Sequence, residues 1–185
     1  MAIQKIDLGG GGSGVSFKYS KEWHVDPVNG LDTNDGSYDK PFKTLDYLVG
    51  QVGNTGEIVY LHAGTYNEDL ILTSLNVTVK GVGIGGIINI TGNVVVGQAT
   101  SSTRIIGVRM SNLFHTGAAA LYLDSCQIVA GFEKSSSGYT EMNDTDLQTA
   151  IVSVTVTATG YVTFNQCRVG PSLYDAVLHV TTYKD

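Results

Sequence analysis

The run Tyr122–Ile128 (YLDSCQI) is echoed by Thr163–Val169 (TFNQCRV), which begins 41 residues later. Both runs carry an apolar residue at the second position, Asp or Asn at the third, Cys at the fifth and a β-branched residue at the seventh. Repeat periods of roughly 20–50 residues are typical of solenoids, and this offset corresponds to two coils of roughly 20 residues each. The repeat therefore predicts a parallel β-solenoid, with apolar side chains inside and polar side chains outside.

The composition agrees with a chain built from strands and turns. Val, Ile and Thr number 21, 12 and 19 of the 185 residues, and Gly is the commonest residue at 23. Such a composition disfavours a helical bundle. Because 42% of the residues are hydrophobic, the chain is not expected to be disordered. The length fits one domain, or one domain with a short appendage.

The charge and the apolar pattern exclude several classes of partner. The net charge is −6, and the Lys and Arg residues are scattered, so no nucleic-acid partner is expected. No apolar run reaches the roughly 18 residues that span a bilayer, so no membrane insertion is expected. The four His and two Cys residues show no zinc-ligand spacing, and no phosphate-binding loop follows a strand. We therefore expect no cofactor.

The chain divides into three predicted parts. Residues 1–20 form a docking segment with a flexible glycine-rich tether, residues 21–55 a turn-rich lead-in with a capping helix, and residues 56–185 a short β-helix. In the first part, Ile3, Ile6 and Leu8 alternate with polar residues. This pattern predicts either a strand that adds to a neighbouring surface or a frayed tail.

The segment Trp23–Gly36 (WHVDPVNGLDTNDG) is dense in Asn, Asp, Gly and Pro, which predicts a series of turns. Asp32, Asn34 and Asp35 resemble part of a calcium-binding loop. However, Asn34 and Asp35 are adjacent, and no Glu follows at the distal position. The alternative is that these side chains close their own turns by hydrogen bonds to the backbone.

A short helix is predicted over Pro41–Val52. Asp39 is the expected N-cap, Pro41 fits the first turn, and Gly53 is placed to end the helix. Apolar residues recur at spacings of three and four, which gives a stripe suited to cover the open end of the first coil. The stripe comprises Phe42, Leu45, Leu48, Val49 and Val52.

Strands are predicted throughout the rest of the chain, because short β-branched runs alternate there with turn residues. The expected strands are Glu57–His62, Asp69–Leu72, Asn76–Val79, Ile87–Ile90, Asn93–Val96, Ser102–Val108, Ala119–Asp124, Ala150–Thr157, Tyr161–Asn165 and Ala176–Thr181. Cys126 and Cys167 hold equivalent positions two coils apart, about 9–10 Å from each other, which is too far for a disulfide bond. Both are therefore expected to be free, packed thiols.

Four stretches resemble a known family. Val25–Gly36 and Lys40–Leu45 look like the start of right-handed parallel β-helix proteins of the pectin-lyase-like superfold, most similar to bacteriophage tailspikes and tail fibres. Gly56–Tyr66 resembles the first coil of these proteins, and Met1–Ile6 is similar to the start of many phage structural proteins. The resemblance implies a right-handed parallel β-helix and assigns no catalytic role to these stretches, which form a structural cap in the family.

Candidate catalytic residues are carboxylates, because β-helix polysaccharide hydrolases use a carboxylate pair. Asp124 falls on a predicted strand, whereas Asn165 takes its place in the second repeat. The other candidates, Glu133, Glu141, Asp144 and Asp146, fall in 131–148, which is predicted to be a surface loop. Exposed tyrosines could stack on sugar rings or pack in turns instead. These are Tyr66, Tyr122, Tyr139 and Tyr161.

The resemblance favours a non-enzymatic virion protein, a tail fibre, tailspike or virion-surface module that contacts a host glycan. It also implies a homotrimer, and the final stretch Val177–Asp185 is predicted to be a strand with no obvious polar cap. The docking segment would bind another virion protein. The alternatives are a polysaccharide depolymerase or a fragment of one, and a capsid-decoration or carbohydrate-binding module.

Overall fold

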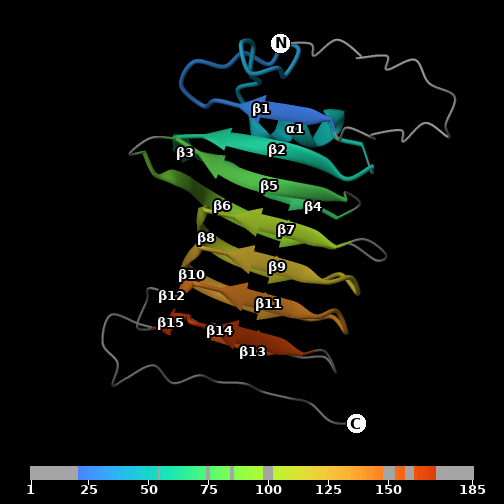
Figure 1. Ribbon diagram of the computed structural model, residues 1–185, viewed down its shortest axis with the longest axis vertical. Helices are drawn as coiled ribbons and strands as arrows, with labels where there is room; N and C mark the ends of the chain where they lie inside the picture. The colour runs from blue at the N-terminus through green and yellow to red at the C-terminus, as the bar shows by residue number, and fades with distance from the viewer. Residues whose placement is uncertain are drawn as a thin grey trace, which may run out of the picture.

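The computed structural model describes residues 21–53, 55–73, 76–83, 86–97, 102–147, 153–156 and 161–169. Within these ranges the chain forms a parallel β-solenoid with one short helix, α1 (Leu45–Gln51) (Figure 1). Ile3, Ile6, Leu8 and the predicted strand Ala176–Thr181 lie outside the described residues.

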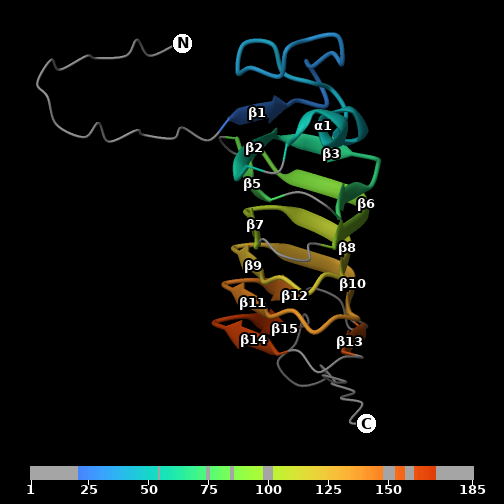
Figure 2. The same ribbon diagram turned by 90° about the vertical axis from the view of Figure 1, so that its right-hand side faces the viewer.

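Two parallel sheets form the walls of the solenoid. In the described residues, one sheet has the strand order β1 (Glu22–Val25), β2 (Glu57–His62), β5 (Val77–Val82), β7 (Thr103–Ile106), β9 (Leu121–Asp124), β11 (Thr140–Asn143) and β14 (Val162–Asn165). The other sheet has the order β15 (Arg168–Val169), β12 (Asp146–Leu147), β10 (Gln127–Lys134), β8 (Arg109–His115), β6 (Ile88–Val96) and β3 (Gly64–Tyr66), with β13 (Ser153–Val156) beside β10 and β4 (Leu70–Leu72) beside β6. Figure 2 shows the two sheets on opposite sides of the stack.

The core consists of apolar columns that run along the stack. Strand residues alternate between inward and outward positions, so β2 buries Glu57, Val59 and Leu61 and leaves Ile58, Tyr60 and His62 partly exposed. Because the strands are parallel and in register, each inward residue lies over its counterpart on the next coil. The central column of the seven-stranded sheet contains Trp23, Val59, Val79, Ile105, Leu123, Met142 and Phe164.

The lead-in segment contains a strand that the sequence did not predict. Residues 23–25 were expected to be turns, yet with Glu22 they form β1 and pair with β2. The chain then returns, and Phe42 forms a parallel bridge with Val25 and packs on Trp23 with ring centres 5.4 Å apart. Gly30 permits this return, since a Cβ there would lie 2.1 Å from the carbonyl oxygen of Phe42.

The helix is shorter than predicted. It begins at Leu45 and not at Pro41, and its N-cap is Thr44 and not Asp39. The Asp32 carboxylate accepts hydrogen bonds from the Lys43 and Thr44 backbone N–H groups and from the Thr44 hydroxyl. These bonds and the bridge to β1 keep the chain before Thr44 out of the helix.

The apolar stripe of the helix faces the first coils. Phe42, Leu45, Leu48 and Val52 are buried, and Val49 is partly buried against the same core. The helix lies at the N-terminal end of the stack, above β2 and β4 (Figure 1). With seven residues it is short, and no helix in the described ranges is long and apolar enough to cross a bilayer.

Residues 131–147, which lie in the predicted surface loop, are instead part of the solenoid. They contain the end of β10 and all of β11 and β12. The alternation was obscured because polar residues occupy inward positions, namely Lys134, Thr140 and Thr145, which are all buried. This coil is the one that separates the two sequence repeats.

The register confirms that the 41-residue offset spans two coils. Asn143 pairs with Asp124 on one side and with Asn165 on the other. Cys126 and Cys167 are free thiols at equivalent positions on the two outer coils of this group. Burial raises the pKa of the Cys126 thiol to about 11, so it remains protonated at neutral pH.

A polar cluster lies inside the solenoid where β8, β10 and β11 meet. His115 Nε2 is 3.0 Å from the Ala119 carbonyl oxygen, and Nδ1 is 2.7 Å from the Thr140 hydroxyl. A carbonyl only accepts hydrogen bonds, so Nε2 carries the proton and Nδ1 accepts from Thr140. Burial, followed by the charge of Lys134, lowers the pKa of His115 to about 4. The Lys134 amine donates to the Ser136 carbonyl, and burial lowers the pKa of Lys134 as well.

We expect His115 to make the fold less stable in acid. Between pH 6.5 and about 4 the unfolded state protonates this imidazole and the folded state does not, so stability falls as the pH falls. His115→Gln removes the titration and retains polar groups. We expect the difference between the wild-type and variant free energies of unfolding to fall by about 2–3 kcal/mol from pH 7 to pH 4. Urea unfolding at each pH measures this difference. A constant difference across this range would contradict the expectation.

Candidate functional site

The outer surface of the seven-stranded sheet carries two columns of polar side chains on successive coils. The register aligns Arg104, Tyr122, Glu141 and Thr163 in one column. The adjacent column contains Ile106, Asp124, Asn143 and Asn165. These positions point outward because they alternate with the buried central column. Residues distant in sequence are therefore neighbours across β7, β9, β11 and β14.

Asn143 joins the two carboxylates of this surface. Its amide nitrogen lies 3.0 Å from Asp124 Oδ1 and 3.2 Å from Glu141 Oε1. Its oxygen accepts a hydrogen bond of 2.9 Å from Asn165. The Asp124 and Glu141 side chains consequently lie within about two hydrogen-bond lengths of each other.

Arg104 offsets the charge of one of these carboxylates. Its Nε donates to Asp124 Oδ2 over 2.6 Å, and its guanidinium carbon lies 5.8 Å from the centre of the Tyr122 ring. The hydrogen bond and the charge of Asp124 raise the pKa of Arg104, which stays protonated. The Arg104 side chain is 51% exposed, so this ion pair contributes little to stability and mainly orients the two side chains.

Three tyrosines lie beside the carboxylates. Tyr122 and Tyr139 make an edge-to-face contact with ring centres 6.3 Å apart, and the Tyr139 hydroxyl donates to Glu141 Oε2 over 3.0 Å. Tyr161 holds the same position as Tyr139 on the next coil and is 78% exposed. We call this surface the tyrosine–carboxylate face; it comprises Arg104, Tyr122, Asp124, Tyr139, Glu141, Asn143, Tyr161, Thr163 and Asn165.

The structure brings some of the candidate residues together and separates others. Asp124 and Glu141 share the face with the tyrosine candidates Tyr122, Tyr139 and Tyr161. Asp144 lies at the bend between the sheets with φ 47° and accepts a hydrogen bond from Ser125. Asp146 lies on β12 of the other sheet, 3.9 Å from Arg168, and Glu133 is on β10 of that sheet.

Tyr66 is not a sugar-contact residue. It is 1% exposed, and its hydroxyl donates to the carbonyl groups of Val25 and His62. The tyrosine therefore ties the first coil to β1 from inside.

The three calcium candidates each hydrogen-bond the backbone of the cap. Asp32 binds residues 43 and 44, as described above, and the Asn34 amide donates to the Pro41 carbonyl over 2.8 Å. Asp35 accepts from the Ser37 backbone N–H. Their side chains hold the chain that leads into α1. Within the described ranges, no group of three or more His, Cys, Asp and Glu side chains is arranged to hold a metal ion.

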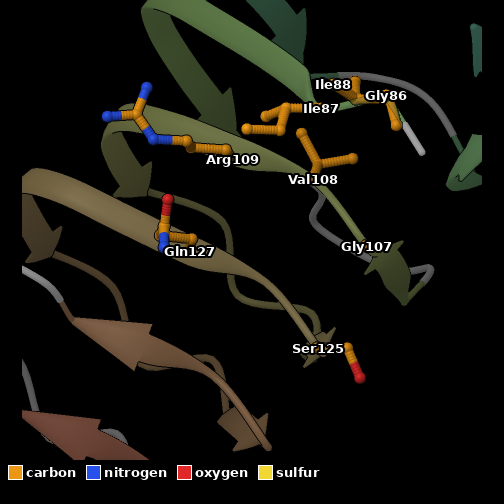
Figure 3. A pocket seen from close by; sticks show the side chains of 8 residues that line it. All are labelled: Gly86, Ile87, Ile88, Gly107, Val108, Arg109, Ser125 and Gln127. Carbon is orange, nitrogen blue, oxygen red and sulfur yellow. The ribbon is translucent and has the colours of Figure 1, made fainter. Parts of the chain in front are cut away.

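A pocket of about 270 Å³ lies at the bend beside this face. Figure 3 shows Arg109 and Gln127, which pair on β8 and β10, together with Gly107 and Ser125 at the bends of successive coils. Ser125 directly follows Asp124, so the pocket lies at the bend where β9 ends. The lining residues are Gly86, Ile87, Ile88, Gly107, Val108, Arg109, Ser125 and Gln127.

Sequence reasoning named the carboxylates and tyrosines but missed Arg104 and Asn143, the residues that link them. The coil between the two repeats was not recognised, and it contains the residue that would have completed the alignment. Laying Glu141–Leu147 between the two repeats would have placed Asn143 in line with Asp124 and Asn165.

Comparisons with known proteins identify the fold. No family model matches the chain, and no curated protein sequence matches it. The crystal structure of a GH136 lacto-N-biosidase from Eubacterium ramulus is similar, with a TM-score of 0.54, 12% identity and coverage of 77% of this chain and 36% of that one. A rhamnogalacturonan lyase gives a TM-score of 0.34, 14% identity and coverage of 84% and 64%. The chain therefore spans only about a third of the length of the first protein, and at this identity the similarity shows the fold alone. The chain is a parallel β-helix protein.

The hydrogen bonds of Asn143 should be measurable in stability. Asn143→Ala removes the donor shared by two carboxylates and leaves them side by side, so we expect a loss of about 1–2 kcal/mol in the free energy of unfolding. Asn165→Ala is the matched control, because its more exposed amide makes one bond to the ladder, and it should cost under about 0.5 kcal/mol. Equal losses in urea unfolding would show that Asn143 does not link the two carboxylates energetically.

Proposed function

We propose that this protein is a non-enzymatic surface module of a bacteriophage virion, of the tail-fibre or tailspike type, whose tyrosine–carboxylate face contacts a host-cell glycan. The support for a phage origin is the sequence resemblance of Val25–Leu45 and Gly56–Tyr66 to the lead-in and first coil of tailspikes. The support for a glycan ligand is the face itself.

The glycan proposal rests on one observation: aromatic rings lie beside polar groups that neighbouring side chains already hold in place. Sugar rings present C–H surfaces that pack on aromatic side chains, and hydroxyls that bond to carboxylates and amides. Tyr161 is exposed, while Glu141 and Asn143 are held by neighbouring side chains. Prior fixation lowers the entropy cost of binding.

A polysaccharide depolymerase is the second candidate, because Asp124 and Glu141 form a close carboxylate pair. Retaining glycosidases hold their two carboxyl groups about 5–5.5 Å apart. However, a general acid of this class lies in a site shielded from water. Asp124 and Glu141 are both partly exposed, and Arg104 and Asn143 already bind their oxygens. This arrangement favours binding over cleavage.

The test is to measure binding and cleavage with the same glycans. Wild-type protein should bind a subset of bacterial capsule or lipopolysaccharide glycans on an array without releasing reducing ends. Tyr161→Ala should weaken binding about tenfold, as expected for the loss of one aromatic contact. Tyr38→Ala, an exposed tyrosine on the cap, is the matched control and should bind normally.

Three outcomes would overturn the proposal. Reducing-end release that Glu141→Gln abolishes would establish the depolymerase instead. Equal losses of glycan binding in the Tyr161 and Tyr38 variants would contradict a binding role for the face. The absence of wild-type binding to any glycan would contradict it as well.

The proposal includes a homotrimer and a docking role for residues 1–20, both by resemblance to tailspikes. Light scattering on the 19.6 kDa chain should then give about three times the chain mass. A monomeric mass across the micromolar range would contradict the trimer and leave the glycan test unaffected.

A further inference from the structure

Two histidines meet on the outer surface at the N-terminal end of the seven-stranded sheet. His24 is on β1 and His62 is the last residue of β2, and His24 Nδ1 lies 3.1 Å from His62 Nε2. The His24 ring stacks on Tyr60 with centres 4.8 Å apart and meets the edge of Tyr38 at 5.3 Å. His24 is buried and His62 is partly exposed, so one imidazole is fixed while the other is reachable from solvent.

This spacing suits a shared metal ion. A transition metal binds imidazole nitrogen at about 2.0–2.1 Å, so two nitrogens on one tetrahedral ion lie about 3.3 Å apart. The observed 3.1 Å needs only a small adjustment of the partly exposed His62 ring. We propose that His24 and His62 form a binding site for a divalent transition metal ion such as Zn²⁺ or Ni²⁺, with water in the remaining positions.

The surrounding charges favour a cation. Glu22 interacts electrostatically with His24, and Asp26 with His62. Burial opposes ionisation of Asp26, but hydrogen bonds from Asn29 and from the Val28 N–H outweigh it and lower the pKa of Asp26, which remains negative. Lys80 is the basic residue in the same column, and the Tyr60 position separates it from His24.

The existing hydrogen bond already aims one nitrogen of each ring at the other. Burial, and then the charge of His62, lowers the pKa of His24. In the absence of metal the two rings share one N–H···N hydrogen bond. A metal ion replaces this single bond with two coordination bonds.

The ion would strengthen the attachment of the cap to the solenoid. β1 begins the segment that folds back over the first coil, and β2 is the first long strand of that coil. Coordination across β1 and β2 adds a cross-link that does not depend on the apolar contacts beneath. Because the unfolded chain does not hold the two rings together, binding stabilises the folded state.

The experiment is thermal unfolding of the full chain in Zn²⁺, in Ni²⁺ and in EDTA. Metal at tenfold excess over its dissociation constant should raise the midpoint of the wild type by about 2–4 °C, with one ion per chain by calorimetric titration. His62→Ala should lose the shift while folding normally in EDTA, because His62 is partly exposed. His115→Gln is the matched control, because His115 is buried where β8, β10 and β11 meet, and it should keep the full shift.

A second readout avoids dependence on stability. Cu²⁺ bound to the wild type should show nitrogen coupling in its electron paramagnetic resonance spectrum, and this coupling should be lost in both His24→Gln and His62→Ala. The proposal is overturned if millimolar Zn²⁺ and Ni²⁺ leave the wild-type midpoint unchanged. It is equally overturned if the His62 variant retains the shift or if His115→Gln abolishes it.

Discussion

The whole molecule depends on the in-register stacking of one central inward side chain per coil. In the seven-stranded sheet this column passes from Trp23 through Val59, Val79, Ile105, Leu123 and Met142 to Phe164. Parallel backbone hydrogen bonds fix the axial position of each strand, and burial of the column fixes which face points inward. A slip of one residue in any strand would turn its apolar residues outward.

The same register creates the outer surface. Since the residues on either side of the buried column must point outward, Tyr122 and Asp124 flank Leu123, and Glu141 and Asn143 flank Met142. The meeting of two carboxylates with one amide is therefore a consequence of core packing. The His24 and His62 pair at the other end of the sheet has the same origin. His24 comes directly after the buried Trp23, and His62 directly after the buried Leu61, so both histidines point outward.

The sequence predicted the features that repeat and missed those that interrupt the repeat. The Cys-containing runs revealed the two-coil offset, and the alternation in Glu57–His62 matches β2 residue for residue. The coil between the runs was hidden because Thr140 and Thr145 replace apolar residues at inward positions. Their hydroxyls are satisfied locally, by His115 and by the Asn143 carbonyl, so burial is possible without an apolar side chain. The helix start was misplaced because a carboxylate eleven residues before Lys43 binds its backbone, a contact that no local pattern contains.

The position of the face in the stack bears on how it would act. Its side chains come from β7, β9, β11 and β14, whereas the cap and α1 close the opposite end at β1. Each coil adds one row of outward groups about 4.8 Å from the last. The four rows therefore extend over roughly 14 Å, long enough to contact more than one sugar unit. If the face binds a glycan as proposed, a chain of sugars would lie along the stack axis and be held by several weak contacts at once. Affinity in such an arrangement comes from the number of rows that are engaged simultaneously, and this number is greatest for a ligand with its own regular repeat.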